Sequence, residues 1–189
     1  MPLNPAHHSN RAAGPRTVTG SRVRLRPLDR SHLASTLRWR NDPELSRLLG
    51  RINPVSEADH ERWFTIVVSQ PDCLFWAIEA MADGAHVGNV WLWAIDRRHQ
   101  KAEVRIVIGE GGALNRGLGS EALDLVARDA FEAVGLHKLY AYVLDINPRA
   151  LRAFEKAGFS REGLLRADRR SEDRFIDVHL VARVKADPA

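Results

Sequence analysis

One stretch of the sequence, residues 102–134, limits the possible folds most tightly. It begins with an alternating apolar and polar run, continues through a glycine-rich loop and ends in a pattern where apolar residues recur every four positions. Such a pattern is typical of a strand, a turn and an amphipathic helix. A strand that leads through glycines into a helix forms an anion site, because the first helical turn has unpaired backbone N–H groups and partial positive charge. The stretch therefore predicts a phosphate-binding turn before a long helix.

The residues of this loop exclude two familiar phosphate motifs. Gly117 and Gly119 would let an anionic ligand approach the backbone, and Arg116 adds positive charge beside them. A Walker loop needs a lysine after its last glycine, and none follows Gly119; the dinucleotide fingerprint needs a third glycine, where this chain has Ala122. A plain connector would show the same glycines. If the loop does bind phosphate, it is of a third type.

The composition indicates one soluble domain. The chain has 189 residues, of which 44% are hydrophobic and 28% are charged. Its single cysteine, Cys73, excludes an intramolecular disulfide and a multi-cysteine zinc site, and no metal is expected. The chain lacks the run of ~20 apolar residues that a membrane span needs, and residues 1–19 lack the apolar centre of a signal peptide. We therefore expect a cytoplasmic protein that does not associate with membranes.

The net charge of +4 leaves two classes of ligand open. A modest basic excess fits an enzyme for phosphorylated ligands and also fits a nucleic-acid binder. The second interpretation has no other support, because the sequence has no helix-turn-helix, RNA-binding signature or aromatic stacking platform. We therefore do not expect nucleic acid as a partner.

Apolar periodicity and turn residues predict the order of the elements. Residues 1–20, rich in Pro, Gly, Asn, Ser and Arg, are expected to be a disordered leader. The predicted helices cover about 31–40, 43–49, 57–70, 119–134 and 148–157, and the predicted strands cover 22–28, 74–80, 86–95, 101–108, 137–145, 160–167 and 174–184. The helix between the strands at 101–108 and 137–145 makes a crossover, so these two strands should be parallel in an otherwise mainly antiparallel sheet.

Two motifs and this element order resemble the GNAT superfamily of acetyl-CoA-dependent N-acetyltransferases. Residues 116–123, Arg-Gly-Leu-Gly-Ser-Glu-Ala-Leu, resemble the pyrophosphate loop of the family. Residues 147–159 resemble its second signature, an asparagine that opens a helix closing in Glu-Lys-Ala-Gly-Phe. The resemblance covers about residues 22–184 and implies one α/β domain over 21–186, with helices on both faces of a mixed sheet and a splayed parallel strand pair. It is nearest to the ribosomal-protein and amino-sugar acetyltransferase branches.

This resemblance implies an enzyme that transfers the acetyl group of acetyl-CoA to a primary amine, by direct attack of the amine on the thioester. The acceptor would be a protein N-terminus, a small molecule or an amino sugar, and relatives often form homodimers. Three positions depart from the family. Leu114 replaces the Gln or Arg of the loop, Phe154 replaces a tyrosine that protonates the leaving thiolate, and Ala150 replaces a serine used in some members. The missing acid motivates an alternative, a non-catalytic acyl-CoA-binding or regulatory module.

The resemblance also assigns site residues. Glu103, on the strand that leads into the loop, is the candidate general base, although it could instead be an exposed glutamate paired with Arg105 or Arg24. Partial burial would raise its pKa toward a useful value. The residues predicted to contact acetyl-CoA are Ile106, Val107, Ile108, Leu114, Asn115, Arg116, Gly117, Leu118, Gly119, Ser120, Asn147, Arg149, Arg152 and Phe154.

Several of these assignments have a structural alternative. Asn147 could bind pantetheine, cap its helix, or do both. Arg149 and Arg152 could reach the 3′-phosphate of CoA or form a solvated helix surface. A run similar to Trp39-Arg40-Asn41 lies near the acceptor in related enzymes, so these residues and Trp91 are the candidate substrate contacts. Tryptophans at these positions could equally be core residues.

Overall fold

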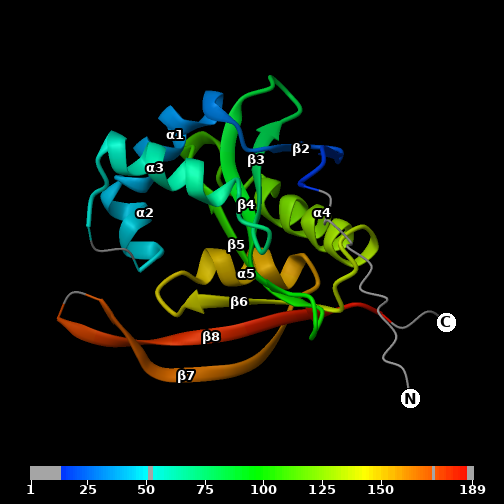
Figure 1. Ribbon diagram of the computed structural model, residues 1–189. Coiled ribbons are helices and arrows are strands. Elements are labelled where there is room, and N and C mark those ends of the chain that lie inside the picture. Colours follow the sequence, from blue (N-terminus) through cyan, green and yellow to red (C-terminus); the bar gives the residue numbers. More distant parts are fainter. Residues whose placement is uncertain (1–13, 51–52, 172, 187–189) are drawn as a thin grey trace, which may run out of the picture.

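The computed structural model of the protein describes residues 14–50, 53–171 and 173–186. Within these residues the chain forms one sheet of eight strands in the order β1-β2-β3-β4-β5-β6-β8-β7, and only the β5–β6 pair is parallel (Figure 1). The sheet confirms the predicted fold class. Its strands are β1 Val18–Thr19, β2 Val23–Pro27, β3 Leu74–Ala80, β4 His86–Asp96, β5 Lys101–Ile108, β6 Lys138–Leu144, β7 Ser160–Ser171 and β8 Arg174–Val184.

Helices cover both faces of this sheet. Figure 1 shows α1, α2 and α3 gathered on one side of strands β2–β5, and α4 on the other side. No helix in the described part of the chain combines the length and the apolar character required to cross a membrane. The helices are α1 Leu33–Arg40, α2 Pro43–Leu48, α3 Glu57–Val67, α4 Leu118–Glu132 and α5 Pro148–Lys156, with short 3-10 turns at Arg30–His32 and Gly111–Ala113.

Helix ends lie where capping residues occur in the sequence. The side chains of Ser56 and Asn147 accept hydrogen bonds from the backbone N–H groups of the first turns of α3 and α5. Beyond the ends of α4 and α5 lie Gly135 and Gly158, whose φ angles of 80° and 81° are in the left-handed region that glycine tolerates best. These local signals confirm the predicted starts of α3 and α5 and the glycine after α4.

Apolar side chains form a separate core on each face of the sheet. The larger core packs α4 and α5 against the sheet and includes Trp76 and Leu123, both fully buried. The smaller core packs α1 and α3 on the opposite face and includes Leu33, Phe64 and Phe75. The central strands are therefore apolar on both faces, and β3 is buried along its whole length.

Strands β5 and β6 pair over only a short part of their length. Their register joins Lys101 to Lys138, Ala102 to Leu139 and Glu103 to Tyr140, and stops there. Strand β5 continues to Ile108, paired with β4 along one edge only. The predicted parallel crossover is confirmed, and the divergence of the two strands leaves backbone groups of β5 unpaired on the side that faces β6.

The leader differs from the expectation in its last residues. Val18 pairs with Leu25 in the β1–β2 ladder, and the Arg16 carbonyl accepts a hydrogen bond of 2.8 Å from the Trp76 indole. Arg16 also pairs with Asp129 of α4. A two-residue strand and one ion pair leave no periodic pattern of apolar residues, so the sequence did not predict that these last residues of the leader have a defined structure. Residues 1–13 of the expected leader lie outside the described part of the chain.

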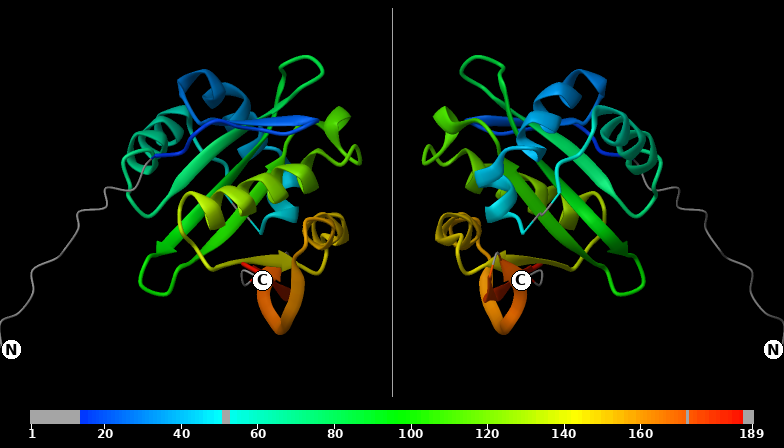
Figure 2. Two further views of the ribbon diagram at one scale, coloured as in Figure 1. Left: turned by 90° about the vertical axis from the view of Figure 1, so that its right-hand side faces the viewer. Right: turned by 90° about the vertical axis from the view of Figure 1, so that its left-hand side faces the viewer.

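The β7–β8 hairpin extends from the body of the molecule (Figure 2). It was predicted, but β7 is longer than expected and ends at Ser171 rather than near Ala167. Nearly all of β7 is exposed, so its pairing with β8 depends on backbone hydrogen bonds rather than on an apolar face. The hairpin places Arg169 near the end of β6, which becomes relevant at the site.

Candidate active site

Two adjoining cavities meet where β5 and β6 diverge. The large cavity has a volume of about 610 Å³ and the small cavity about 300 Å³. Both are lined by Ile106 and Val107 of β5 and by Asn147 and Ala150 at the start of α5. A ligand that lies in the small cavity can therefore extend through the gap between the strands into the large one.

The glycine loop and the first turn of α4 form one wall of the small cavity. Gly117 is the N-cap of α4, with a φ of 76°, and lines the cavity together with Gly119 and Ser120. The first helical hydrogen bond within α4 comes from the Glu121 N–H, which donates to the Gly117 carbonyl at 3.1 Å. The earlier N–H groups of the turn are left for a ligand, as expected of an anion site. The predicted loop residues that line this cavity are Leu114, Asn115, Gly117, Leu118, Gly119 and Ser120.

Helix α5 supplies positive charge to the same cavity. Arg149, Arg152 and Lys156 line it, and none of the three has a side-chain hydrogen bond or ion pair with another described residue. No carboxylate of the described residues lines this cavity. Arg116, also predicted as a ligand contact, is exposed and does not line the cavity; its carbonyl accepts a hydrogen bond from Arg22. The basic side chains therefore come from α5 rather than from the loop.

The junction of the two cavities contains one amide and several apolar side chains. Asn147 accepts a hydrogen bond of 3.1 Å from the Ala150 N–H, and its own amide donates to the Leu48 carbonyl at 3.4 Å. Ile108 lines the small cavity beside it. Phe154 lines the large cavity and packs edge-to-face on Phe159, with ring centroids 5.1 Å apart. Its phenyl ring cannot donate a proton.

Aromatic rings form much of the wall of the large cavity. Trp91 stacks on Phe75 at 5.6 Å and 11°, and Phe75 meets Trp63 edge-to-face at the same centroid distance. Trp63 in turn stacks on His60 of α3 at 5.0 Å and 14°. All four rings line the cavity. The structure therefore places Trp91, a predicted substrate contact, in a continuous aromatic surface built from α3, β3 and β4.

Only two residues of the Trp39-Arg40-Asn41 run line this site. Trp39 and Arg40 line the large cavity, and the Trp39 indole N–H donates to the Glu110 carboxylate at 3.0 Å. Asn41 does not line it. Its amide instead bonds the backbone of Val55 in both directions, at 2.9 and 2.8 Å, so it holds the segment before α3. The expectation that Asn41 contacts substrate finds no support in this position.

Glu103 lies in the large cavity as half of an ion pair. Its carboxylate accepts two hydrogen bonds from Arg105, at 2.6 and 2.9 Å, and its side chain is 12% exposed. The Arg105 guanidinium also lies over the Trp93 ring at 5.5 Å. Glu103 therefore pairs with Arg105, as one of the two interpretations expects, and it does so inside the cavity. Its role as general base stays a prediction.

Comparison with known protein families identifies the family of this chain. Residues 22–160 match the family described as the acetyltransferase (GNAT) domain, which covers most of the chain. The chain belongs to the GNAT acetyltransferase family. It is an N-acetyltransferase that uses acetyl-CoA.

Individual GNAT relatives include enzymes named for a polyamine. The chain is 33% identical over 159 residues to the spermidine N(1)-acetyltransferase of Escherichia coli K12, covering 76% of this chain and 75% of that one. It is 22% identical over 188 residues to an uncharacterized N-acetyltransferase, p20, of Bacillus licheniformis, covering 92% and 98%.

Solved GNAT structures share the fold. A Vibrio cholerae spermidine N-acetyltransferase in complex with CoA and spermine superposes with a TM-score of 0.80 at 23% identity, covering 87% of this chain and 96% of that one. A putative acetyltransferase from T. thermophilus has a TM-score of 0.72 at 30% identity, covering 91% and 90%. The superfamily is thus confirmed. The narrower placement in a ribosomal-protein or amino-sugar branch stays a prediction.

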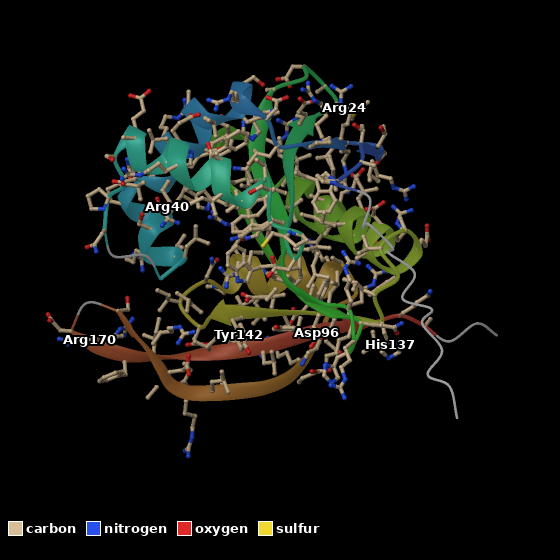
Figure 3. All side chains as sticks on the ribbon, viewed as in Figure 1. Arg24, Arg40, Asp96, His137, Tyr142 and Arg170 are labelled. Atoms are coloured by element: carbon tan, nitrogen blue, oxygen red, sulfur yellow. The ribbon has the colours of Figure 1, made fainter. Side chains whose placement is uncertain are left out.

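Several polar residues of the large cavity of this GNAT enzyme were not predicted from the sequence. Among them, His60, Tyr142 and Arg169 line the cavity from α3, β6 and β7. Figure 3 labels Tyr142 on β6 and, from the opposite wall, Arg40 at the end of α1. His60 precedes Trp63 by one helical turn, so it could have been noticed as a polar residue on an apolar helix face. Arg169 lies in a charged run that gives no such signal.

Proposed function

We propose that this GNAT enzyme acetylates a primary amine bound in the large cavity, by direct attack of the amine on the thioester of acetyl-CoA bound in the small one. The observation that carries the proposal is the divergence of β5 and β6 after Glu103. It joins the two cavities at Ile106, Val107 and Asn147, so the two substrates can meet there without leaving the protein.

The residues of the small cavity fit CoA. The free N–H groups of the α4 turn suit its diphosphate, and the unpaired Arg149 and Arg152 suit its 3′-phosphate. Unpaired backbone groups of β5 between Ile106 and Ile108 suit the pantetheine amides, which would add to the strand edge. When bound, acetyl-CoA supplies the acetyl group as an activated thioester.

We assign Glu103 as the group that accepts the proton of the incoming amine. A lysine-type amine has a pKa near ~10.4 and an α-amine near ~8, so both arrive protonated at neutral pH and must lose a proton before attack. Glu103 is largely buried, lines the large cavity and is oriented by its two hydrogen bonds to Arg105. Phe154 and Ala150 have no acidic proton, so neither protonates the leaving thiolate.

The experiment is a turnover assay with a panel of amines. Purified protein, acetyl-CoA and one amine at a time are followed by release of free thiol and by mass spectrometry of the product. The panel holds spermidine, an amino sugar, free amino acids and a peptide with a free N-terminus, which covers the branches named by relatives and by the sequence motifs. At least one primary amine should gain roughly 42 Da, the mass added when an acetyl group replaces a proton.

Absence of turnover with every amine would contradict the proposed enzymatic function. Tight CoA binding with no thiol release for any amine would support the alternative of a non-catalytic acyl-CoA-binding module. A homodimeric state and a cytoplasmic location stay predictions from the sequence.

A further inference from the structure

The large cavity carries more positive than negative charge. Among its described lining residues the one carboxylate is Glu103, and Arg105 already binds it. The cations are Arg105, Arg40 and Arg169, and Arg169 is paired with Asp168 at 2.8 Å. A polyamine with several ammonium groups would bring further positive charge to a wall that has no free carboxylate among these residues. Such an arrangement opposes binding of a polycation.

Arg40 is the cation of this wall that lacks a partner among the described residues. It is half-buried at the end of α1, and its side chain has no hydrogen bond or ion pair with any of them. Its backbone carbonyl is engaged with the Ser46 hydroxyl, so the main chain at this position is fixed. A guanidinium on a fixed backbone, with its donors unused, matches a planar two-oxygen anion.

His60 gives an independent sign of a missing ligand. Its side chain is 5% exposed and lines the same cavity, yet Nε2 has no hydrogen-bond partner among the described residues. Buried polar atoms are rarely left unpaired, because each costs free energy without a partner. Burial, and then the charge of Arg40, lower the pKa of His60, while a hydrogen bond to the Leu33 backbone opposes this. A neutral imidazole has one N–H donor and one acceptor nitrogen, so Nε2 can serve as an acceptor when Nδ1 carries the proton.

From these contacts we infer that Arg40 and His60 form a polar subsite of the acceptor cavity, and that the acceptor is a small amine that also carries a carboxylate. The Arg40 guanidinium pairs with the carboxylate, His60 Nε2 accepts an N–H of the amine, and the aromatic wall of Trp63, Phe75 and Trp91 packs on the remaining apolar part. The inference rests on the proposed function, because it takes the large cavity as the acceptor site.

Matched pairs of acceptors test this inference. Each pair differs only by the carboxylate: phenylalanine with phenethylamine, tryptophan with tryptamine, and γ-aminobutyrate with propylamine; spermidine is the polycation. We expect at least one carboxylate-bearing amine to exceed its partner in kcat/KM by roughly tenfold or more, the factor typical of one charge-assisted hydrogen-bonded pair. Phenethylamine, tryptamine, propylamine or spermidine exceeding every aminocarboxylate would overturn the inference.

Variants of Arg40 show whether this residue produces the preference for a carboxylate-bearing acceptor. Arg40→Gln should reduce the ratio within the preferred pair to about one, mainly through KM, and Arg40→Lys should restore part of it because the charge remains without the planar fork. Arg47→Gln is the matched control, since Arg47 is an exposed arginine of α2 that lines neither cavity. An unchanged ratio in a folded Arg40→Gln protein would assign the preference elsewhere and sink the proposal. His60→Phe keeps the ring against Trp63 and should lower kcat/KM for the same acceptor by roughly tenfold.

A binding measurement separates failure of this inference from failure of the proposed function. Titration of CoA-saturated protein with phenylalanine, and in parallel with phenethylamine, reports recognition without turnover. Preferential binding of phenylalanine that is lost in Arg40→Gln supports the subsite even if no amine is acetylated. Turnover of spermidine alone, with no binding of phenylalanine or γ-aminobutyrate, would retain the acetyltransferase and reject the carboxylate subsite.

Discussion

The two cavities differ in what builds them. The small cavity is formed largely by one continuous loop, by the turn that follows it and by one face of α5, and its anion-binding groups include main-chain amides. The large cavity takes side chains from α1, α2, α3 and α5, from the four strands β3–β6 and from the β7–β8 hairpin, between residues 28 and 178. Main-chain geometry can stay constant while side chains change. The contrast predicts that sequence changes alter the large cavity more readily than the small one.

The largest effect should come from Glu103 in the large cavity. Glu103→Gln removes the proposed base but preserves the shape of the side chain, so we expect kcat to fall by roughly a hundredfold or more. The CoA dissociation constant, measured by calorimetry, should stay unchanged because Glu103 does not line the small cavity. Glu44→Gln, an exposed glutamate of α2, is the control. A parallel loss of CoA affinity would show that the two cavities are not independent.

A large side chain at Gly119, which would fill part of the small cavity, should have the next largest effect. A Cβ at Gly119 would make ordinary contact with Ile108 at 3.4 Å, so Gly119→Ala should be tolerated, whereas the longer side chain of Gly119→Leu must occupy ligand space. We expect the dissociation constant of CoA to rise by roughly ten- to a hundredfold for leucine, by analogy with lost charge-assisted hydrogen bonds. Gly112→Ala, where a Cβ meets open space, is the control. Unchanged affinity in Gly119→Leu would remove the basis for placing CoA here.

A moderate and pH-dependent effect is expected at Glu121, in the first turn of α4. Burial alone would raise the pKa of this carboxyl, but hydrogen bonds from Arg22 and Ser21 lower it to about 2. A lowered carboxyl pKa stabilises the folded state above the unfolded value near ~4.3, and this stabilisation is lost as the pH falls toward 2. Glu121→Gln should therefore lower the free energy of unfolding by roughly 2 kcal/mol at pH 7, with partial exposure of Arg22 allowed for.

Chemical denaturation at several pH values measures that difference. The gap between wild type and Glu121→Gln should be constant from pH 7 to about 5 and should close progressively toward pH 2. The matched control is Glu132→Gln at the other end of α4, where the side chain is exposed. A gap of constant size down to pH 2 would show that Glu121 acts through packing rather than through its charge.

The smallest effect should come from the α5 arginines. Arg149→Gln and Arg152→Gln should each weaken CoA binding only by roughly two- to fivefold, because partly exposed charges are screened, and the loss should shrink further in high salt. Dephospho-CoA sharpens the test, since it lacks the 3′-phosphate. If either arginine contacts that phosphate, its variant should bind CoA and dephospho-CoA equally. Effects larger than that of Gly119→Leu would mean that side chains, rather than main chain, dominate the small cavity.

Much of the fold could be predicted from local patterns. Strands β3 and β5 have the predicted bounds, because turn residues flank a clear apolar run in each. Strand β1 was missed because two residues are too few to show a period, and β7 was shortened because its exposed, charged residues have no apolar alternation. Where pairing depends on the backbone alone, the side chains carry no signal.

The site was predictable to a different extent in its two halves. The glycine loop and Asn147, which line the small cavity, were singled out because a contiguous turn and a helix cap each leave a local signature. Their contact with CoA stays a prediction. His60 and Arg169 were missed because their proximity is produced by tertiary packing of distant segments. Asn41 was assigned to substrate from a motif, although its amide is used to hold the chain at Val55. A motif gives position along the chain and does not determine where a side chain points.

Gly109 lines neither cavity, yet its lack of a side chain lets the Trp39 indole pack directly against it. A Cβ at this position would lie 2.1 to 2.4 Å from three atoms of the Trp39 indole, which is a wall of the large cavity. The same indole is tied to Glu110, the next residue on the way to the glycine loop. Any larger residue at position 109 would push the acceptor wall away from the strand that leads to CoA. Selection for a fixed spacing between amine and thioester would then show itself as intolerance of substitution at a position that neither substrate touches.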